Sequence, residues 1–387
     1  MSFKPTAEIV TPEIDHLRAM GGIKWSRYEP DVLPAWVADM DIRPPDCVTE
    51  AVANLAERGD FGYNRRAAEL LPEAFVRWQE SSHGWAPDPD EVRSFCDVLH
   101  AIDMALWLHT EPGDGVVLFT PIYPPFLRAL EGARRRLVDV PLDRDGWRFN
   151  PDTLRSAIDS GTRAILTCNP HNPTGRVFDT DELAAMAEIA EEHDLLILSD
   201  EVWADLVYPG AMHTPIASIS DAAAARTMTI SAASKTFNMA GLRCAMAHIG
   251  HRELAAQFDS LPNHLRGAVS TPGAEASLAA WTQGRPWLDA LRDHLLARRD
   301  QLARRLAADL PSVGFTIPEA TYLAWLDFSA LGLGNNPSER LESVARLALS
   351  PGPDFGPLGD GFSRLNFATS EAILDELLDR LASAIKA

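Results

Sequence analysis

Lys235 lies in a run of small and polar residues, S-A-A-S-K-T-F-N, which spans residues 231–238. The residues just before it, T-M-T-I (227–230), have the composition of a β-strand, so the lysine follows a predicted strand. A lysine in such a loop suits a side chain that forms and re-forms a Schiff base. Arg243, eight residues later, suits a phosphate anchor. The same motif also fits a solvated loop lysine, so its interpretation depends on partners elsewhere in the chain.

Three further motifs follow predicted strands and could hold a flat, charged ligand. N-P-H-N-P-T-G (169–175) is a turn fixed by two prolines and a glycine, and it presents the amide of Asn172. Asp200, in S-D-E-V-W (199–203), is a carboxylate at a buried strand end and needs a cationic partner, such as a protonated ring nitrogen. Tyr123, in T-P-I-Y-P-P-F (120–126), is placed to stack on a ring. Each motif alone also fits a structural role, as a turn, a helix cap or a core tyrosine.

A fourth motif, D-V-L-H (97–100), opens a predicted helix that extends to His109. The backbone N–H groups at a helix start bind phosphate. Ligands of open α/β sheets bind outside the carboxyl ends of the strands, where these motifs are expected to meet.

The elements that must position these residues form an α/β pattern. Continuous apolar runs predict strands of a mainly parallel sheet that is covered on both faces. These runs are residues 116–120, 164–168, 195–199, 227–231 and 245–249. Between them lie helices such as 181–192, with Asp179 as N-cap and Glu182 completing a capping box.

The character of the chain changes after about residue 284. An amphipathic helix (286–310), a β-type segment (322–328) and a final helix (371–385) predict a smaller α+β domain. We expect residues 46–283 to form the large ligand-binding domain and residues 284–387 the small one. The proline-rich residues 1–45 are expected to pack on the small domain or on a partner subunit.

Composition limits the class of protein. The chain has 387 residues and a net charge of −20, which argues against nucleic acid and anionic membranes as partners. The longest apolar runs are too short to cross a bilayer, and residues 1–8 have no apolar signal region, so we expect a cytoplasmic protein. The four cysteines are widely spaced, which favours buried thiols over a disulfide or metal site.

Together the motifs resemble the fold-type I enzymes that use pyridoxal 5'-phosphate, in the class I/II aminotransferase superfamily. The likeness is greatest to the MalY/PatB group of cystathionine β-lyases, or C–S lyases, and it covers nearly the whole chain. It rests on K-W (24–25), L-P-A-W-V-A-D-M-D (33–41), N-P-H-N-P-T-G, S-K-T-F-N-M-A-G-L (234–242) and T-Y-L-A-W-L-D-F (321–328). The resemblance implies a seven-stranded sheet in an aminotransferase-like large domain, and a small domain built from both chain ends.

The resemblance also implies roles for single residues. Lys235 would bind the cofactor aldehyde and then act as the proton-transfer base, and Asp200 would keep the ring nitrogen protonated. Tyr123 would stack on the ring and belong to the catalytic set, while Asn172 would bond to the ring hydroxyl oxygen beside Trp203. The phosphate would be held by Val98, Leu99, Ser234, Arg243 and, from a second subunit of a homodimer, Tyr63. The amino-acid substrate would contact Arg364, through its carboxylate, together with Ala38, Asn172 and Tyr322.

Four positions depart from the pattern of the family. Asp97 replaces a usual glycine and brings a carboxylate near the phosphate, so either its side chain turns away as an N-cap or the phosphate is held differently. Ala232 replaces a phosphate-binding Ser or Thr, and Ala320 replaces a glycine before T-Y-L. Trp203 stands where relatives have Tyr or His, which removes a hydrogen bond near the ring hydroxyl and narrows the pocket.

The resemblance favours β-elimination from cystathionine or another cysteine S-conjugate, with thiol, pyruvate and ammonia as products. Transamination between an amino acid and a 2-keto acid begins with the same loss of the Cα proton and is the alternative reaction. A third hypothesis is a non-catalytic regulatory protein on this fold. The intact pair of Lys235 and Asp200 argues against it.

Overall fold

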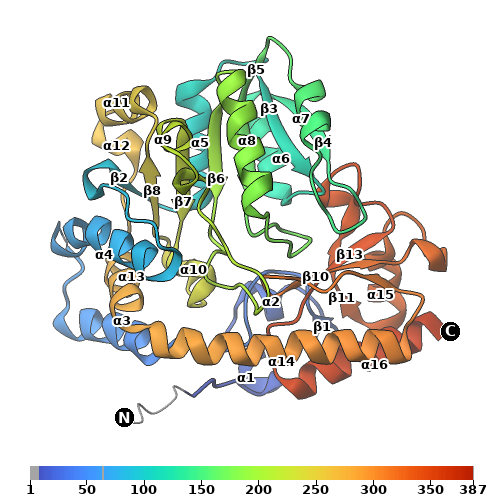
Figure 1. The fold of residues 1–387 in the computed structure, drawn as a ribbon. Helices are drawn as coiled ribbons and strands as arrows, with labels where there is room; N and C mark the ends of the chain where they lie inside the picture. Colours follow the sequence, from blue (N-terminus) through green and yellow to red (C-terminus); the bar gives the residue numbers. More distant parts are fainter. Residues whose placement is uncertain (1–7, 63–64, 387) are drawn as a thin grey trace.

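The computed structural model describes residues 8–62 and 65–386, and Figure 1 shows two parts joined by a long helix. The larger part is built on a seven-stranded sheet with the strand order β2-β8-β7-β6-β5-β3-β4. Its strands are β2 (Val92–Phe95), β3 (Gly115–Thr120), β4 (Arg136–Pro141), β5 (Thr162–Cys168), β6 (Leu196–Asp200), β7 (Thr227–Ser231) and β8 (Ala245–Ile249). Strand β8 runs antiparallel to both of its neighbours, and the remaining pairs are parallel. The predicted mainly parallel, seven-stranded sheet is confirmed.

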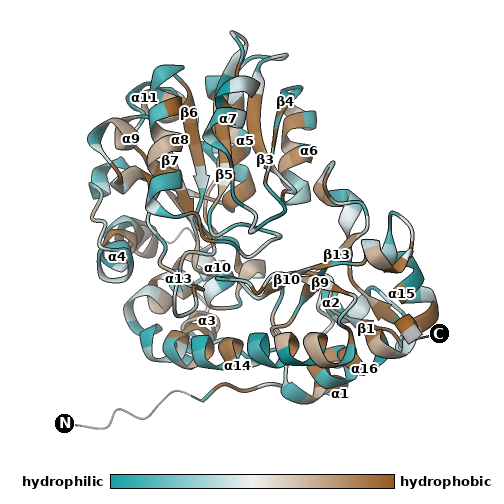
Figure 2. Cartoon of the chain, turned by 45° about the vertical axis from the view of Figure 1, so that its right-hand side comes forward, coloured by the Kyte–Doolittle hydropathy of each residue, from teal (hydrophilic) through white to brown (hydrophobic). Residues whose placement is uncertain are grey.

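The five predicted strands correspond to β3, β5, β6, β7 and β8. Every residue of β3, β6, β7 and β8 is buried, as the continuous apolar runs indicated. Figure 2 shows these strands as a brown layer between helices whose outer faces are teal. The pattern did not reveal β2 and β4, because both are edge strands. Each carries charged residues on its exposed side, namely Arg93 in β2 and Arg136 and Asp139 in β4.

Helices cover both faces of this sheet (Figure 1). They include α5 (Val98–His109), α6 (Pro124–Ala133), α7 (Pro151–Ala157), α8 (Thr180–Glu192), α9 (Asp221–Ala225) and α11 (Arg252–Ser260). The capping box predicted for α8 is confirmed. Asp179 Oδ1 accepts from the backbone N–H of Glu182 at 2.9 Å, and Glu182 Oε2 accepts from the N–H of Asp179 at 3.0 Å.

The smaller part contains an antiparallel sheet of order β12-β13-β10-β9. Its strands are β9 (Gly314–Phe315), β10 (Leu323–Asp327), β12 (Ser350–Pro351) and β13 (Phe362–Asn366), and α15 (Pro337–Ala345) and α16 (Glu371–Lys386) accompany them. The predicted amphipathic helix is α14 (Arg285–Asp309), which runs along the base of the molecule in Figure 1. The division of the chain into a large and a small domain near residue 284 stays a proposal.

The N-terminal segment joins the smaller part through a short parallel pairing. Strand β1 (Leu33–Pro34) pairs with β11 (Leu347–Ala348), which supports the proposal that residues 1–45 pack on the small domain. Helices α3 (Asp46–Arg58), α4 (Arg65–His83) and α13 (Thr271–Gln283) then pack together below the large sheet. Within residues 8–62 and 65–386, no helix combines the length and apolar character that crossing a membrane requires.

Candidate active site

The motifs chosen from the sequence converge on one cavity of about 330 Å³ at the carboxyl ends of the parallel strands. Its walls come from the start of α5, the loops after β3 and β5, the end of β6 and the short helix α10 (Ala233–Thr236). Ten of the predicted site residues line it: Ala38, Val98, Leu99, Tyr123, Asn172, Asp200, Trp203, Ser234, Lys235 and Arg243. The structure thus brings together residues that lie up to 205 positions apart, from Ala38 to Arg243.

Lys235 is half-buried in the wall of this cavity, and its side chain ends in the amine that could react with an aldehyde. Nζ donates a hydrogen bond to the carbonyl oxygen of Ala38 at 2.9 Å and lies 5.7 Å from the centre of the Trp203 ring. Burial lowers the pKa of Lys235, while the carboxylates of Asp39 and Asp200 act to raise it and Arg364 acts to lower it. A lysine with a lowered pKa has more of its amine in the neutral, nucleophilic form at neutral pH.

Asp200 ends β6 on the far side of the cavity and is 3% exposed. Oδ1 accepts from the N–H of Val202 at 3.1 Å, and Oδ2 is 3.9 Å from the Cys168 sulfur. Within the described residues no salt bridge reaches this carboxylate, so burial raises its pKa to about 7. A cation placed in the cavity against Oδ2 would supply the missing partner and keep Asp200 ionised.

The turn that presents Asn172 is fixed by a close contact with residues 318–320. Gly175 has φ +71°, and a Cβ there would lie 2.4 Å from the Cβ of Pro318. Its carbonyl oxygen accepts from the N–H groups of Glu319 and Ala320, both at 2.9 Å. Only glycine fits this position, and the rigid turn holds the Asn172 amide, which is 3% exposed, against the cavity.

Arg364, on β13, is buried behind Asn172 and does not itself line the cavity. Nη1 donates to Asn172 Oδ1 at 2.9 Å, and Nη2 donates to the Trp36 carbonyl oxygen at 2.9 Å and to Ser350 Oγ at 3.2 Å. Its Nε is buried with no hydrogen-bond partner among the described residues. Burial lowers the pKa of Arg364 to about 10. An unpaired donor on a buried guanidinium marks a place where an anion would be stabilised.

Tyr322 and Trp203 close the inner end of the site. Their rings meet edge to face with centroids 4.8 Å apart, and the Tyr322 hydroxyl donates to the Ala38 carbonyl oxygen at 3.0 Å. Tyr322 therefore shares an acceptor with Lys235, although it does not line the cavity. Trp203 is 2% exposed, and its bulk narrows the pocket.

The opposite end of the cavity has the groups that a phosphate requires. Helix α5 begins there with the N–H groups of Val98 and Leu99, which have no acceptor inside a helix. Asp97 Oδ1 caps the helix by accepting from the N–H of His100 at 2.8 Å, which is the first of the two alternatives that the sequence left open for this residue. Its Oδ2 forms an ion pair with the exposed Arg243. Ala232, at the start of α10, lines this cavity with a methyl group and offers no hydroxyl.

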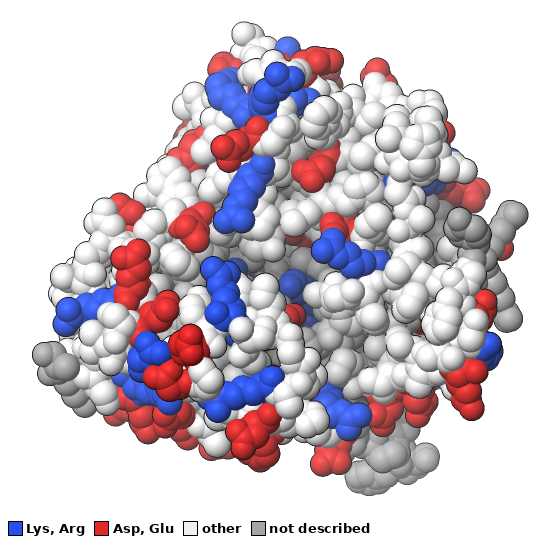
Figure 3. All heavy atoms as spheres, turned by 180° about the vertical axis from the view of Figure 1, so that it is seen from behind, with Lys and Arg blue, Asp and Glu red and all other residues white. Residues whose placement is uncertain are grey.

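One predicted site residue cannot be placed, and three residues near the site were not predicted. Tyr63 lies outside the described residues, so its predicted role stays a prediction. Sequence reasoning missed Cys168, Ser350 and Phe355, whose ring lies 5.0 Å from the Arg364 guanidinium. Only Cys168, which directly precedes the N-P-H-N-P-T-G motif, had a signal in the sequence. On the face shown in Figure 3, several basic side chains border a central hollow, and acidic side chains lie around it as well.

These residues fit pyridoxal 5'-phosphate. The unpaired carboxylate of Asp200 would hold the ring nitrogen, Lys235 would bind the aldehyde, and the α5 start with Arg243 and Ser234 would hold the phosphate. Tyr123 also lines the cavity, where its ring could stack on the cofactor ring. The unpaired Nε of the buried Arg364 would then serve a substrate carboxylate.

Replacing Arg364 with lysine is expected to lower kcat/KM by roughly 10- to 100-fold, mainly through a higher KM. Lysine keeps the charge but cannot offer two parallel donors to a carboxylate. Steady-state kinetics on an amino-acid substrate check this, with Arg346→Lys as the matched control, because Arg346 pairs with Asp31 on the surface. An unchanged KM in Arg364→Lys would remove Arg364 from the substrate site.

The sequence and the structure of this chain were compared with known proteins, and both have close matches. The family model described as aminotransferase class I and II matches residues 37–381. Cystathionine beta-lyase PatB of Bacillus subtilis is 37% identical over 360 residues, which are 92% of this chain and 93% of PatB. A proposed PLP-dependent beta-cystathionase from Corynebacterium diphtheriae has a solved structure with a TM-score of 0.93 and 34% identity, covering 98% of this chain and 100% of that one. Cystalysin from Treponema denticola, solved with pyridoxal 5'-phosphate, gives a TM-score of 0.91 at 29% identity, covering 100% and 99% of the two chains.

Proposed function

The chain belongs to the class I and II aminotransferase family, and from this premise we propose that it is a pyridoxal-phosphate-dependent carbon–sulfur β-lyase. Its substrate would be cystathionine or another cysteine S-conjugate. Each turnover would consume one water and release one thiol, one pyruvate and one ammonium ion. The observation that carries the proposal is the convergence of Lys235, Asp200 and the phosphate-binding groups on one cavity with Arg364 directly behind it. Relatives named as lyases along almost the whole chain favour elimination among the reactions of the family.

When bound, the cofactor supplies an aldehyde that condenses with amines and a protonated ring that accepts the electrons left at Cα. The protein residues orient this chemistry. Asp200 would keep the proton on the ring nitrogen, and Arg364 would hold the substrate carboxylate and so orient the substrate toward Lys235. Lys235 Nζ, steered by the Ala38 carbonyl, accepts the Cα proton and can return it to the departing sulfur. The buried ring of Trp203, with Tyr322 packed behind it, would exclude water from that part of the cavity wall.

Transamination is the alternative that the description of the family favours, because the same residues can return the proton to the cofactor instead of expelling a thiol. The two reactions differ in their need for a second substrate. Purified protein with pyridoxal phosphate is mixed with cystathionine and a series of S-alkyl cysteines. We expect pyruvate and thiol to form without any added 2-keto acid. Product formation that depends on an added 2-keto acid would contradict the lyase proposal and support an aminotransferase.

We further propose that the active protein is a cytoplasmic homodimer in which Tyr63 of one subunit reaches the phosphate of the other. A groove between the N-terminal segment and the loop after Lys235 is lined by residues such as Leu17, Met20, Trp25 and Val52. The exposed apolar side chains of Met20, in this groove, and of Ile23 support a buried subunit interface there. Tyr63→Phe should weaken retention of pyridoxal phosphate several-fold, roughly the loss of one hydrogen bond to a charged group, while the dimer persists. Dialysis followed by absorbance measurement checks retention, and sedimentation checks the dimer. Unchanged retention would exclude Tyr63 from the site.

A further inference from the structure

Residues 36–41, which we call the strap, connect the two parts of the molecule beneath the cavity. Each carbonyl oxygen from residue 36 to residue 40 accepts a hydrogen bond from a side chain of another segment. The donors are Arg364 and Ser350 to residue 36, Asn366 to residues 37 and 39, Lys235 and Tyr322 to residue 38, Lys24 to residue 39 and Asn238 to residue 40. The strap therefore contacts both the residue that carries the reactive amine and the residue that binds the substrate carboxylate.

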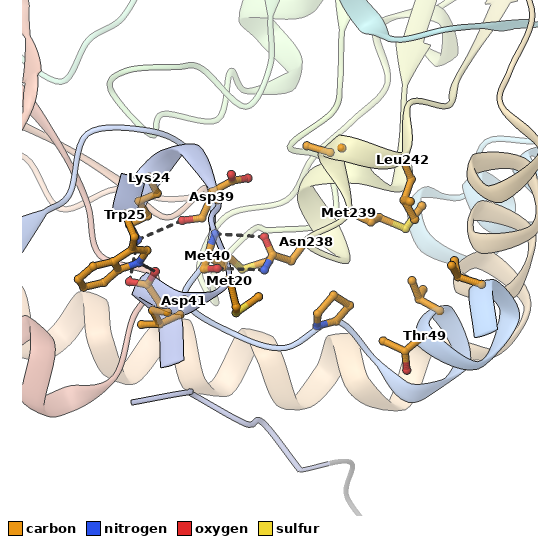
Figure 4. Close-up of a pocket in the computed structure, with 17 residues that line it drawn as sticks. Met20, Lys24, Trp25, Asp39, Met40, Asp41, Thr49, Asn238, Met239 and Leu242 are labelled. Atoms are coloured by element: carbon orange, nitrogen blue, oxygen red, sulfur yellow. Dashed lines mark hydrogen bonds and ion pairs between the residues drawn. The ribbon is translucent and has the colours of Figure 1, made fainter. Parts of the chain in front are cut away.

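A buried ion pair holds the far end of the strap. Lys24, on α2 (Ile23–Ser26), places Nζ 2.7 Å from Asp41 Oδ2 and 3.2 Å from the Asp39 carbonyl oxygen. Trp25 Nε1 donates to the other oxygen, Asp41 Oδ1, at 2.7 Å. Figure 4 shows Lys24 and Trp25, from α2, beside Asp41, from the strap. The side chains of Lys24 and Asp41 are 4% and 3% exposed, so water cannot replace either partner.

Asn238 holds the strap from the large domain. Its Oδ1 accepts from the N–H of Met40 at 3.1 Å, and its Nδ2 donates to the carbonyl oxygens of Met40 at 3.0 Å and Ile42 at 2.7 Å. Asn238 lies three residues after Lys235, and Figure 4 shows its amide hydrogen-bonded to the backbone of Met40. The strap is thus fixed on both sides, by Asn238 near the reactive lysine and by the Lys24–Asp41 pair at its end.

We propose that Lys24 and Asp41 are positioning residues for Lys235, which act by fixing the strap so that the Ala38 carbonyl and the Asp39 carboxylate face the reactive amine. This inference rests on the proposed function, because it assumes that Lys235 carries the cofactor. Lys24 and Asp41 touch neither the cavity nor Lys235, so their influence must pass through the strap backbone. A strap that loses its anchor would move the Ala38 acceptor and the Asp39 charge away from Nζ.

The expected effect has a definite sign. Asp39 and Asp200 favour the protonated form of the Lys235 nitrogen, whereas burial and Arg364 oppose it. Loosening the strap weakens the contribution of Asp39 and removes the acceptor at Ala38, while Asp200 and Arg364 stay in place. The pKa of the Lys235 nitrogen should therefore fall, and the pH-dependent absorbance change of the bound cofactor should move to lower pH.

The decisive variant replaces the pair with apolar residues, Lys24→Met together with Asp41→Leu. Lys24→Met alone leaves a buried carboxylate unpaired and is expected to lower Tm strongly, whereas the double variant should recover most of that Tm. Both should show an absorbance midpoint at least about half a pH unit lower and a kcat reduced roughly tenfold. KM should change less than kcat, because Arg364 keeps Asn172 and Ser350 as partners.

Two further variants separate an effect of the strap from a general loss of stability. Met186→Ala opens a cavity in α8, far from the strap, and should lower Tm without moving the absorbance midpoint. Asn238→Gly removes the other anchor at a position whose φ of +52° suits glycine, and should move the midpoint in the same direction as the double variant. This variant decides the question if the double variant does not fold.

The proposal is overturned if the folded double variant, or Asn238→Gly, keeps the parent kcat and absorbance midpoint. It is equally overturned if Met186→Ala shifts the midpoint as much as they do, because the shift would then report stability alone. Failure of the proposed function looks different. In that case the unchanged parent protein would show no cofactor absorbance that depends on Lys235, or no release of thiol, before any strap variant is compared.

Discussion

Lys235→Ala is expected to abolish the visible absorbance of the bound cofactor and to lower thiol release at least about 10³-fold. The variant loses both the covalent attachment point and the group that moves the Cα proton. The cavity itself should remain, because the Lys235 amine makes one hydrogen bond, to the Ala38 carbonyl, among the described residues. Absorbance spectra of protein incubated with pyridoxal phosphate and an assay of thiol release check the two effects together.

Lys235→Arg is the matched control for this prediction, because it keeps a cation near Ala38 and Trp203 but offers no amine to an aldehyde. It should be as inactive as Lys235→Ala while binding pyridoxal phosphate noncovalently. Thiol release by either variant at more than a tenth of the parent rate would contradict the assignment of Lys235.

Asp200→Asn is expected to lower kcat by about 10²- to 10³-fold, since a neutral amide cannot hold a proton on the ring nitrogen. The same change should stabilise the cofactor-free protein at alkaline pH. The pKa of Asp200 is raised from 3.8 in the unfolded chain to about 7 in the folded chain. The folded state therefore binds more protons between these values, and stability falls as pH rises from about 4 to 7.

Above pH 7 the buried charge of Asp200 costs the cofactor-free protein roughly 4 kcal/mol, which the asparagine variant avoids. We expect Asp200→Asn to have a higher Tm than the parent at pH 8, and a difference that shrinks toward pH 4. Thermal unfolding of both proteins without cofactor tests this, with Asp15→Asn as a control because Asp15 is fully exposed. A lower Tm for Asp200→Asn at pH 8 would show that the carboxylate is already paired.

The parts of the fold that the sequence predicted share one physical cause. Strands β3, β5, β6, β7 and β8 are covered on both faces, so burial forces nearly continuous apolar runs. Most site residues follow these strands directly, and the sheet topology alone then brings them to one edge. The edge strands β2 and β4 escaped because one side of each meets solvent and accepts charged residues.

What the sequence could not predict are contacts between distant segments. The hydrogen bond from Lys235 to Ala38 joins residues 197 positions apart, and the bond from Arg364 to Asn172 joins residues 192 apart. Asp97 illustrates the same limit. An N-cap was one of the two alternatives that the sequence left open for this residue, but nothing in the sequence showed that its second oxygen pairs with Arg243, 146 positions later. No local pattern encodes such partners, because the tertiary fold creates them.

The proposed function requires that Lys235 carries pyridoxal phosphate within the cavity at the carboxyl edge of the sheet. The most direct measurement incubates the protein with the cofactor, reduces the bond between them with borohydride and maps the labelled peptide by mass spectrometry. We expect one cofactor per chain, attached to Lys235, with no label in Lys235→Ala. Stoichiometric labelling of Lys24 or another lysine, or no label on the parent protein, would contradict the claim.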